Sequence, residues 1–244
     1  MRHLLPKVYR LLLILVIFGA GVGVQRIGLI DYLLDPYEYP LIIKLFWQHL
    51  YLVGCSMGLA TVAGLSVGIL LTRRQFKKYA GVGMYIVSLG QTIPSLAVIA
   101  LAMSFLGIGA TSAIFALTIY SILPIARNTL AGIMAVPPPL IDAAQGMGMP
   151  PWRLLLEVEL PMAMKVIITG FRVALIINIG TAALAFLIGA GGLGDLIFSG
   201  ISLMEPDKLL AGAIPLTLLA LLGDYLCELV GLLLIPPGLR LEEG

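Results

Sequence analysis

Few residues of this 244-residue chain could do chemistry, and one charged segment is set between long apolar runs. It spans residues 142–161 and reads Asp-Ala-Ala-Gln-Gly-Met-Gly-Met-Pro-Pro-Trp-Arg-Leu-Leu-Leu-Glu-Val-Glu-Leu-Pro. The only histidines are His3 and His49, so neither a Ser-His-Asp nor a Cys-His set is present. No GxxxxGK[ST] sequence occurs, and the glycine-rich run 189–194 has no lysine, so the chain has no loop that cradles ATP phosphates. The segment 142–161 is therefore expected to bind another molecule rather than to catalyse a reaction.

The remaining candidate groups exclude several classes of partner. Cys55 and Cys227 lie inside apolar runs without a CxxC or Cys/His companion, so no metal site is expected. The net charge is only +2, which implies no nucleic-acid partner.

Composition predicts an all-α integral membrane protein. The chain is 60% hydrophobic and 11% charged, with a mean hydropathy of +1.06. Strand-like alternation is absent, and helices satisfy their own backbone groups in lipid. Six apolar runs are long enough to cross about 30 Å of hydrocarbon. They are residues 11–30, 49–72, 80–106, 111–136, 162–188 and 209–235.

The placement of lysine and arginine predicts the orientation. With the N-terminus inside, three of the 15 basic residues fall outside, namely Arg26, Lys44 and Lys208. The others fall on or near the cytoplasmic side, so both termini and residues 142–161 are expected there. Residues 1–18 also fit a signal peptide, but no clear Ala-x-Ala site follows and an uncleaved span is favoured.

The chain reads as one domain with an N-terminal addition. Residues 1–48 are expected to form the extra span and an extracytoplasmic linker (31–47). Residues 49–235 would form the transmembrane core, and residues 236–244 a cytoplasmic tail.

Within the core, residues 137–161 are expected to form a helix-turn-helix along the membrane surface. The three prolines at 137–139 stop the preceding helix, and Asp142 would cap a short new one. A turn at Gly146 and Gly148 would precede a second helix from Trp152 to about Leu160, ended by Pro161. Its charged face, with Glu157 and Glu159, would be repelled by anionic lipid, so a protein partner is favoured over a loop resting on headgroups.

The same residues resemble the signature of permease subunits of binding-protein-dependent ABC importers. That signature is Glu-Ala-Ala, three residues, Gly, nine residues, then Ile-x-Leu-Pro. Here Asp142-Ala143-Ala144 is followed by Gly148 and by Val158-Glu159-Leu160-Pro161. The departures, Asp for Glu and Val for Ile, preserve charge and shape.

A wider resemblance, over about residues 49–235, is closest to importers of glycine betaine, choline and carnitine. It is carried by 49–53, Gly90-Gln91-Thr92-Ile93-Pro94-Ser95, 117–129, Ile177-Asn178-Ile179-Gly180-Thr181-Ala182 and 188–194. Methionine importers share parts of this set, so an amino-acid substrate stays open.

This resemblance implies a type I importer fold and a set of partners. These are a cytoplasmic ATPase that holds ATP and Mg, an extracytoplasmic substrate-binding protein, a second permease subunit and membrane lipid. This chain would need no cofactor of its own.

The resemblance also implies site residues. Those expected to couple to the ATPase are Asp142, Ala143, Ala144, Gly148, Trp152, Arg153, Glu157, Leu160 and Pro161. An outer loop, 189–207, would gate the passage or dock the binding protein through Gly189, Gly191, Gly192, Gly194 and Asp195, or would be a re-entrant turn without a specific role.

Polar residues inside the spans are costly in lipid and need partners. Arg172 lies at a depth comparable to Asp224 and Glu228, which predicts an ion pair with one of them that joins two helices. Residues that could line the passage, or form helix-packing hydrogen bonds, are Gln91, Thr92, Pro94, Tyr120, Asn178 and Thr181. A secondary transporter is the rival class, but the inverted repeats it would need are not visible.

Overall fold

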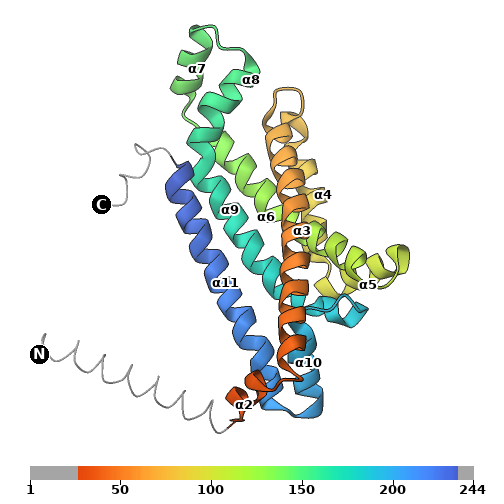
Figure 1. Cartoon of the computed structure of the whole chain (residues 1–244). Helices are drawn as coiled ribbons and strands as arrows, with labels where there is room; N and C mark the ends of the chain where they lie inside the picture. The colour runs from red at the N-terminus through yellow and green to blue at the C-terminus, as the bar shows by residue number, and fades with distance from the viewer. Residues whose placement is uncertain (1–26, 236–244) are drawn as a thin grey trace, which may run out of the picture.

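The computed structural model describes residues 27–235 as an elongated bundle of helices (Figure 1). Within this range four helices are long and apolar enough to cross a membrane, and one bent pair would make a fifth. Most of the expected first span, 11–30, lies outside the described residues, as does the tail 236–244. The all-helical membrane fold is therefore confirmed for the part of the chain that the structure describes.

Three long helices form the centre of the bundle. They are α3 (Tyr39–Thr72), α6 (Ala110–Met134) and α9 (Leu160–Ala182), and α11 (Pro206–Leu234) packs against α9. Glycines allow the close approach, because a Cβ on Gly68 of α3 would lie 2.8 Å from the Ala126 carbonyl oxygen of α6.

The expected linker at 31–47 is mostly helical, and the next long helix begins earlier than expected. A short helix, α2 (Leu29–Leu34), is followed by α3, which begins at Tyr39, ten residues before the expected start. Pro40 occupies the first turn of α3, where its fixed φ suits a helix and its missing N–H leaves no bond unmade.

The apolar run 80–106 is not one straight span. It forms α4 (Ala80–Thr92) and α5 (Ser95–Leu106), which meet at an angle of 93°. Ile93 and Pro94 between them are extended, with ψ values of 133° and 136°. Proline disfavours the helical conformation in the residue before it and lacks the N–H that would continue the helix.

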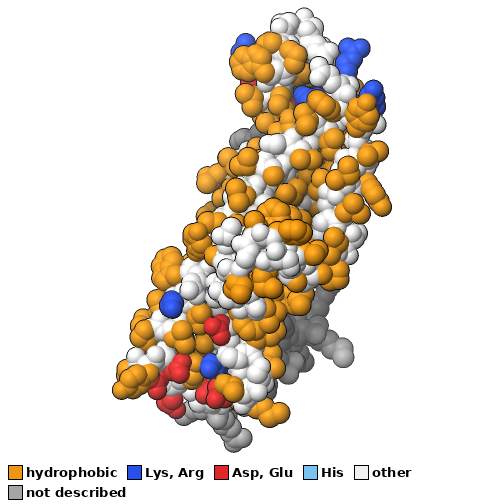
Figure 2. Space-filling model, turned by 90° about the vertical axis from the view of Figure 1, so that its right-hand side faces the viewer, with side chains coloured by type: hydrophobic (Ala, Val, Ile, Leu, Met, Phe, Trp, Pro, Cys, Tyr) orange, Lys and Arg blue, Asp and Glu red, His pale blue; other side chains and the backbone are white. Residues whose placement is uncertain are grey.

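The two ends of the bundle differ in charge. Figure 2 shows most of the visible lysine and arginine side chains at the end formed by the α3–α4 turn and the two short helices that directly follow α6. We call this the basic end. Most visible acidic side chains gather at the opposite, acidic end, where α2 and the α10–α11 turn lie. There the Tyr32 phenol donates to the Glu38 carboxylate (2.8 Å), and burial together with this contact raises the pKa of Tyr32.

Candidate functional site

Two short helices project beyond the rest of the bundle at the basic end (Figure 1). They are α7 (Pro138–Gly146) and α8 (Pro151–Leu154), and the turn between them contains Gly148 with φ of +80°. The Met149 N–H donates to the Ala144 carbonyl (3.1 Å), which closes the end of α7. The sequence region 137–161 thus forms the two short helices that its prolines and glycines predicted.

Two details of that prediction were wrong. Asp142 does not cap α7, because the helix already begins at Pro138, whose missing N–H suits the first turn. Pro161 does not end the second helix, because residues 151–188 form one continuous helical stretch. A π-helical turn, Leu155–Glu159, precedes Pro161, and this wider turn accommodates a residue that cannot donate a backbone hydrogen bond.

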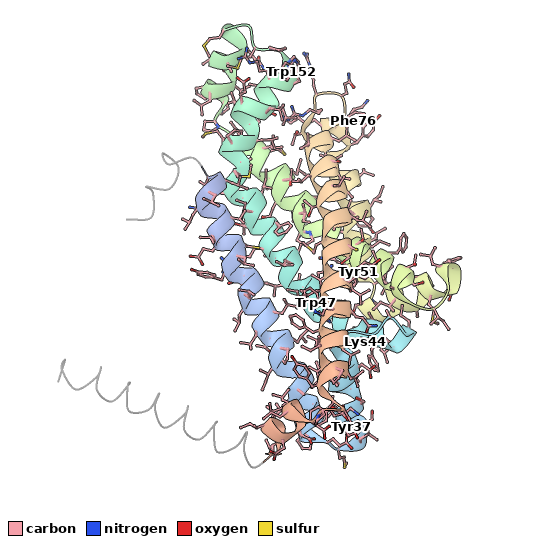
Figure 3. All side chains as sticks on the ribbon, viewed as in Figure 1. Tyr37, Lys44, Trp47, Tyr51, Phe76 and Trp152 are labelled. Atoms are coloured by element: carbon pink, nitrogen blue, oxygen red, sulfur yellow. The ribbon has the colours of Figure 1, made fainter. Side chains whose placement is uncertain are left out.

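The projecting helices present an exposed surface and bury two apolar side chains. Trp152 is 64% exposed at the tip (Figure 3), and Asp142 and Ala143 are also exposed. Ala144 and Leu154 face inward and are buried. Tryptophan is enriched among the residues that dominate binding energy, so an exposed tryptophan on this helix pair is a candidate contact for a protein partner.

Four more of the expected coupling residues lie on or below this surface. Arg153 and Glu157 form an exposed ion pair (2.6 Å) across one helical turn. Leu160 begins α9 and is half-buried, as is Pro161 next to it.

Sequence reasoning placed Glu159 on the charged face, and the structure corrects this. Glu159 is only 7% exposed, and its carboxylate accepts a hydrogen bond from Arg73 Nη2 at 2.5 Å. Arg73 follows the last residue of α3, so the pair joins the α3–α4 turn to the π-helical turn below α8. The sequence shows a glutamate among apolar residues and, 86 positions earlier, Arg73 after another apolar run, but nothing in it pairs the two.

At the acidic end, the sequence predicted that the outer segment 189–207 is a loop, but part of this segment is helical. A helix, α10 (Gly194–Leu203), occupies half of it, and a compact loop with three left-handed glycines precedes this helix. The φ values of Gly189, Gly191 and Gly192 are +71°, +74° and +95°. These values are strained for any residue with a side chain, so the sequence places glycine where the backbone demands it.

Gly194 is required for a different reason. A Cβ on it would lie 1.8 Å from the Ala183 carbonyl oxygen, so α10 begins in direct contact with the end of α9. Asp195 follows in the first turn of α10 and is exposed, available to a partner at this end.

Inside the bundle, the ion pair expected for Arg172 is present. Its guanidinium donates two hydrogen bonds to the Asp224 carboxylate, from Nε to Oδ1 and from Nη2 to Oδ2 (2.5 Å). The pair joins α9 to α11, and both side chains are partly exposed in the single chain, at 40% and 29%. Glu228, the other expected partner, lies one turn further along α11 and is exposed.

Most of the expected path residues gather at the break between α4 and α5. Gln91 Nε2 donates to the Tyr120 carbonyl (2.7 Å), and the Tyr120 phenol donates to the Ile93 carbonyl (2.6 Å). Pro94 and Thr92 are exposed at this break. The two hydrogen bonds tie the bent α4–α5 pair to α6 and satisfy a carbonyl that the break leaves free.

Asn178 has a packing environment instead. It is fully buried, and its amide donates to Ser56 of α3 (2.9 Å) and Ser121 of α6 (2.8 Å). For Asn178 this placement favours helix-packing hydrogen bonds, which the sequence left open as the alternative to lining the passage. Thr181, one turn away, is half-buried and donates to the Ile177 carbonyl of its own helix (2.8 Å).

Known proteins are similar in sequence to this chain over most of its length. Residues 60–232 match the family described as the binding-protein-dependent transport system inner membrane component. The osmoprotectant import permease protein OsmY of Salmonella typhimurium is 46% identical over 93% of this chain and 92% of its own length. The carnitine transport permease protein OpuCB of Listeria monocytogenes is 44% identical over 80% of this chain and 88% of its own.

Solved structures share the fold. A chain of the inward-facing MetNI methionine ABC transporter superposes with a TM-score of 0.73 at 24% identity, over 83% of this chain and 99% of its own. An amino acid ABC transporter with histidines gives a TM-score of 0.68 at 22% identity, over 82% and 97%. The fold is that of type I ABC importer permeases. The chain belongs to the family of inner membrane components of binding-protein-dependent transport systems.

Proposed function

We propose that this chain is the permease subunit of an ATP-driven importer for small osmoprotectants such as glycine betaine, carnitine or choline. The observation that carries the substrate class is the 46% identity to an osmoprotectant import permease over nearly the whole of both chains. The methionine and other amino-acid transporters resemble the chain at 24% and 22% identity, a level that speaks for the fold alone.

The basic end is proposed to face the cytoplasm and to receive the ATPase. The excess of lysine and arginine at this end supports the orientation. The exposed helices α7 and α8 would fit into the ATPase surface with Trp152 at the contact. Closure of an ATPase dimer on ATP and Mg would then move these helices in two permease subunits, identical or related, as rigid bodies. Both termini would be cytoplasmic.

The acidic end is proposed to face outward and to meet the substrate-binding protein. The compact glycine loop at 189–194 and the exposed Asp195 support a role in docking and gating there. The residues at the α4–α5 break, Gln91, Thr92, Pro94 and Tyr120, would border the passage between the two permease subunits. Selection of the substrate would belong mainly to the binding protein.

Uptake into proteoliposomes tests the proposal. The permease, its ATPase and its binding protein are reconstituted, and radiolabelled glycine betaine is offered with and without ATP. We expect ATP-dependent uptake that unlabelled choline or carnitine reduces and methionine does not. Uptake that needs no ATP would overturn the importer proposal, and competition by methionine alone would overturn the substrate class.

The two tryptophans provide a matched pair for the ATPase contact. Trp152 and Trp47 are 64% and 65% exposed but lie far apart, Trp152 at the basic end and Trp47 along the bundle (Figure 3). Trp152→Ala should weaken ATPase binding by about 30-fold, as the loss of a dominant interface residue does. Trp47→Ala should leave it unchanged. Equal effects of the two changes would contradict the proposed contact.

A further inference from the structure

A buried histidine on α3 lies outside every site described so far. His49 is fully buried, and its Nε2 lies 3.1 Å from the Ile179 carbonyl oxygen of α9. Its Nδ1 is also buried and has no hydrogen-bond partner among the described residues. Buried polar groups are costly in a bilayer, so a histidine at this position needs a reason.

The contact lies where the helix geometry of α9 changes. Residues 183–188 continue α9 as a 3₁₀-helix, and the Ala183 N–H is directed to the carbonyls of Gly180 and Thr181. In an α-helix this N–H would bind the Ile179 carbonyl instead. Since the change of helix type removes that donor, the N–H on His49 Nε2 satisfies the carbonyl in its place. His49 thus stabilises the junction between α9 and the 3₁₀-helix that leads into the outer glycine loop.

Its neighbour in the chain contacts the loop directly. Gln48 Oε1 accepts a long hydrogen bond from the Gly192 N–H (3.4 Å). A Cβ on Gly191 would lie 2.1 Å from the same oxygen, and a Cβ on Gly192 would lie 3.2 Å from His49 Nδ1. The imidazole therefore touches the loop on one side and the α9 carbonyl on the other, and no side chain fits between α3 and the loop.

We infer that Gln48 and His49 are positioning residues for the outer glycine loop, residues 189–194. His49 fixes the junction at the end of α9 through the Ile179 carbonyl, and Gln48 fixes the loop through the Gly192 N–H. The residue just before the loop is also held, because the Ile188 carbonyl accepts a hydrogen bond from the Gly109 N–H at the start of α6 (2.8 Å). The functional consequence rests on the proposed role of this loop in docking and gating.

Hydrogen exchange tests the inference on the assembled permease–ATPase complex in lipid nanodiscs. His49→Leu removes the donor, and the amides of residues 183–194 should then exchange roughly tenfold faster. His49→Gln should stay close to the wild type, because its amide N–H can reach the same carbonyl. Tyr51→Leu, an exposed change on the same helix, is the matched control and should have no effect. Equal exchange in His49→Leu and the wild type would overturn the inference, as would a His49→Gln variant that behaves like His49→Leu.

A second variant keeps the test decisive if His49→Leu does not assemble. Gln48 is half-buried, and Gln48→Leu should raise exchange at residues 191–193 while the peptides of α7 and α8 stay unchanged. Both variants should also lose the stimulation of ATP hydrolysis by the binding protein but retain the basal rate. If wild-type vesicles fail to take up solute, the proposed function fails whatever the exchange data say. If uptake is normal and exchange is unchanged in both variants, the positioning role alone fails.

Discussion

Replacement of Arg73 by alanine should destabilise the permease and weaken its coupling to ATP. Arg73 Nη2 lies 2.5 Å from Glu159 Oε2, and the two side chains are 29% and 10% exposed. Loss of one partner from a fully buried pair costs about 3–5 kcal/mol because the other charge stays buried. An exposed pair is worth about 0–1 kcal/mol. Because water reaches Arg73 but hardly reaches Glu159, we expect an interaction energy of about 2 kcal/mol.

A double-mutant cycle separates this energy from other losses. Arg73 also bonds to the Thr72 hydroxyl and the Ile69 carbonyl, so Arg73→Ala alone removes more than the ion pair. The cycle combines Arg73→Ala with Glu159→Gln and measures unfolding by dodecyl sulfate in mixed micelles. The Arg153–Glu157 pair is the control, because it lies in the same region with both side chains about half exposed (52% and 45%). Its interaction energy should be about 0.3–0.5 kcal/mol.

The same variants test coupling. The Arg73–Glu159 contact fixes the π-helical turn that carries α7 and α8, so its loss should lower the solute transported per ATP hydrolysed. Tyr51→Leu, an exposed change outside the proposed ATPase contact, is the control for coupling and should retain the wild-type ratio. An Arg73–Glu159 interaction energy no larger than that of the control pair would refute the reasoning, because it would mean that burial of Glu159 does not strengthen the contact.

Five further substitutions, at four positions, test packing inside the bundle. Gly170→Ala places a Cβ 2.5 Å from that of Asn128 and should cost about 1–3 kcal/mol, whereas Gly180→Ala meets nothing within 4 Å and should cost nothing measurable by thermal unfolding in detergent. Asp224→Asn should reduce the yield of assembled complex but leave the relative uptake of betaine and choline unchanged, and a changed preference with normal assembly would contradict a structural role. Asn178→Leu should cost about 1 kcal/mol, because the serines it contacts keep bonds to their own helices, and Asn178→Asp should cost more because it buries a charge.

Features with a local cause were predictable from the sequence. Prolines at 137–139 and 150–151, with glycine at 148, indicated two short helices because each residue type restricts or frees its own backbone. Arg172 inside an apolar run required a partner, and only α11 offered carboxylates at a similar depth. The 93° bend at Pro94 also had its signal in the sequence, but the apolar run around it was read as one span.

Features that depend on distant contacts were not predictable in this way. The usual behaviour of proline predicts that a helix ends at Pro161, yet the π-helical turn before this residue lets the helix continue. The residues around Glu159 predict an exposed charge, but the fold buries Glu159 beside its partner Arg73, which lies 86 positions earlier. His49 bonds a carbonyl 130 positions away, and nothing in its own neighbourhood marked that contact.

The Arg73–Glu159 and His49–Ile179 contacts both hold the same long helical stretch. Residues 151–188 form one helical stretch of 38 residues, about 57 Å long at 1.5 Å per residue. Its hydrogen-bond pattern changes near its two ends, from π to α just after Glu159 and from α to 3₁₀ after Ala182. Such changes of helix type are where a long helix can bend. Side chains of α3 or of the residue just after it bond at both changes: Arg73 to Glu159 of the π-helical turn, and His49 to the Ile179 carbonyl of α9. The helix between them is regular, so a displacement of α7 and α8 must either bend α9 at a junction that α3 holds or move α3 and α9 together. If both contacts are kept during transport, α3 and α9 move together. The α3–α9 pair, and not α9 alone, then transmits motion from the basic end to the acidic end.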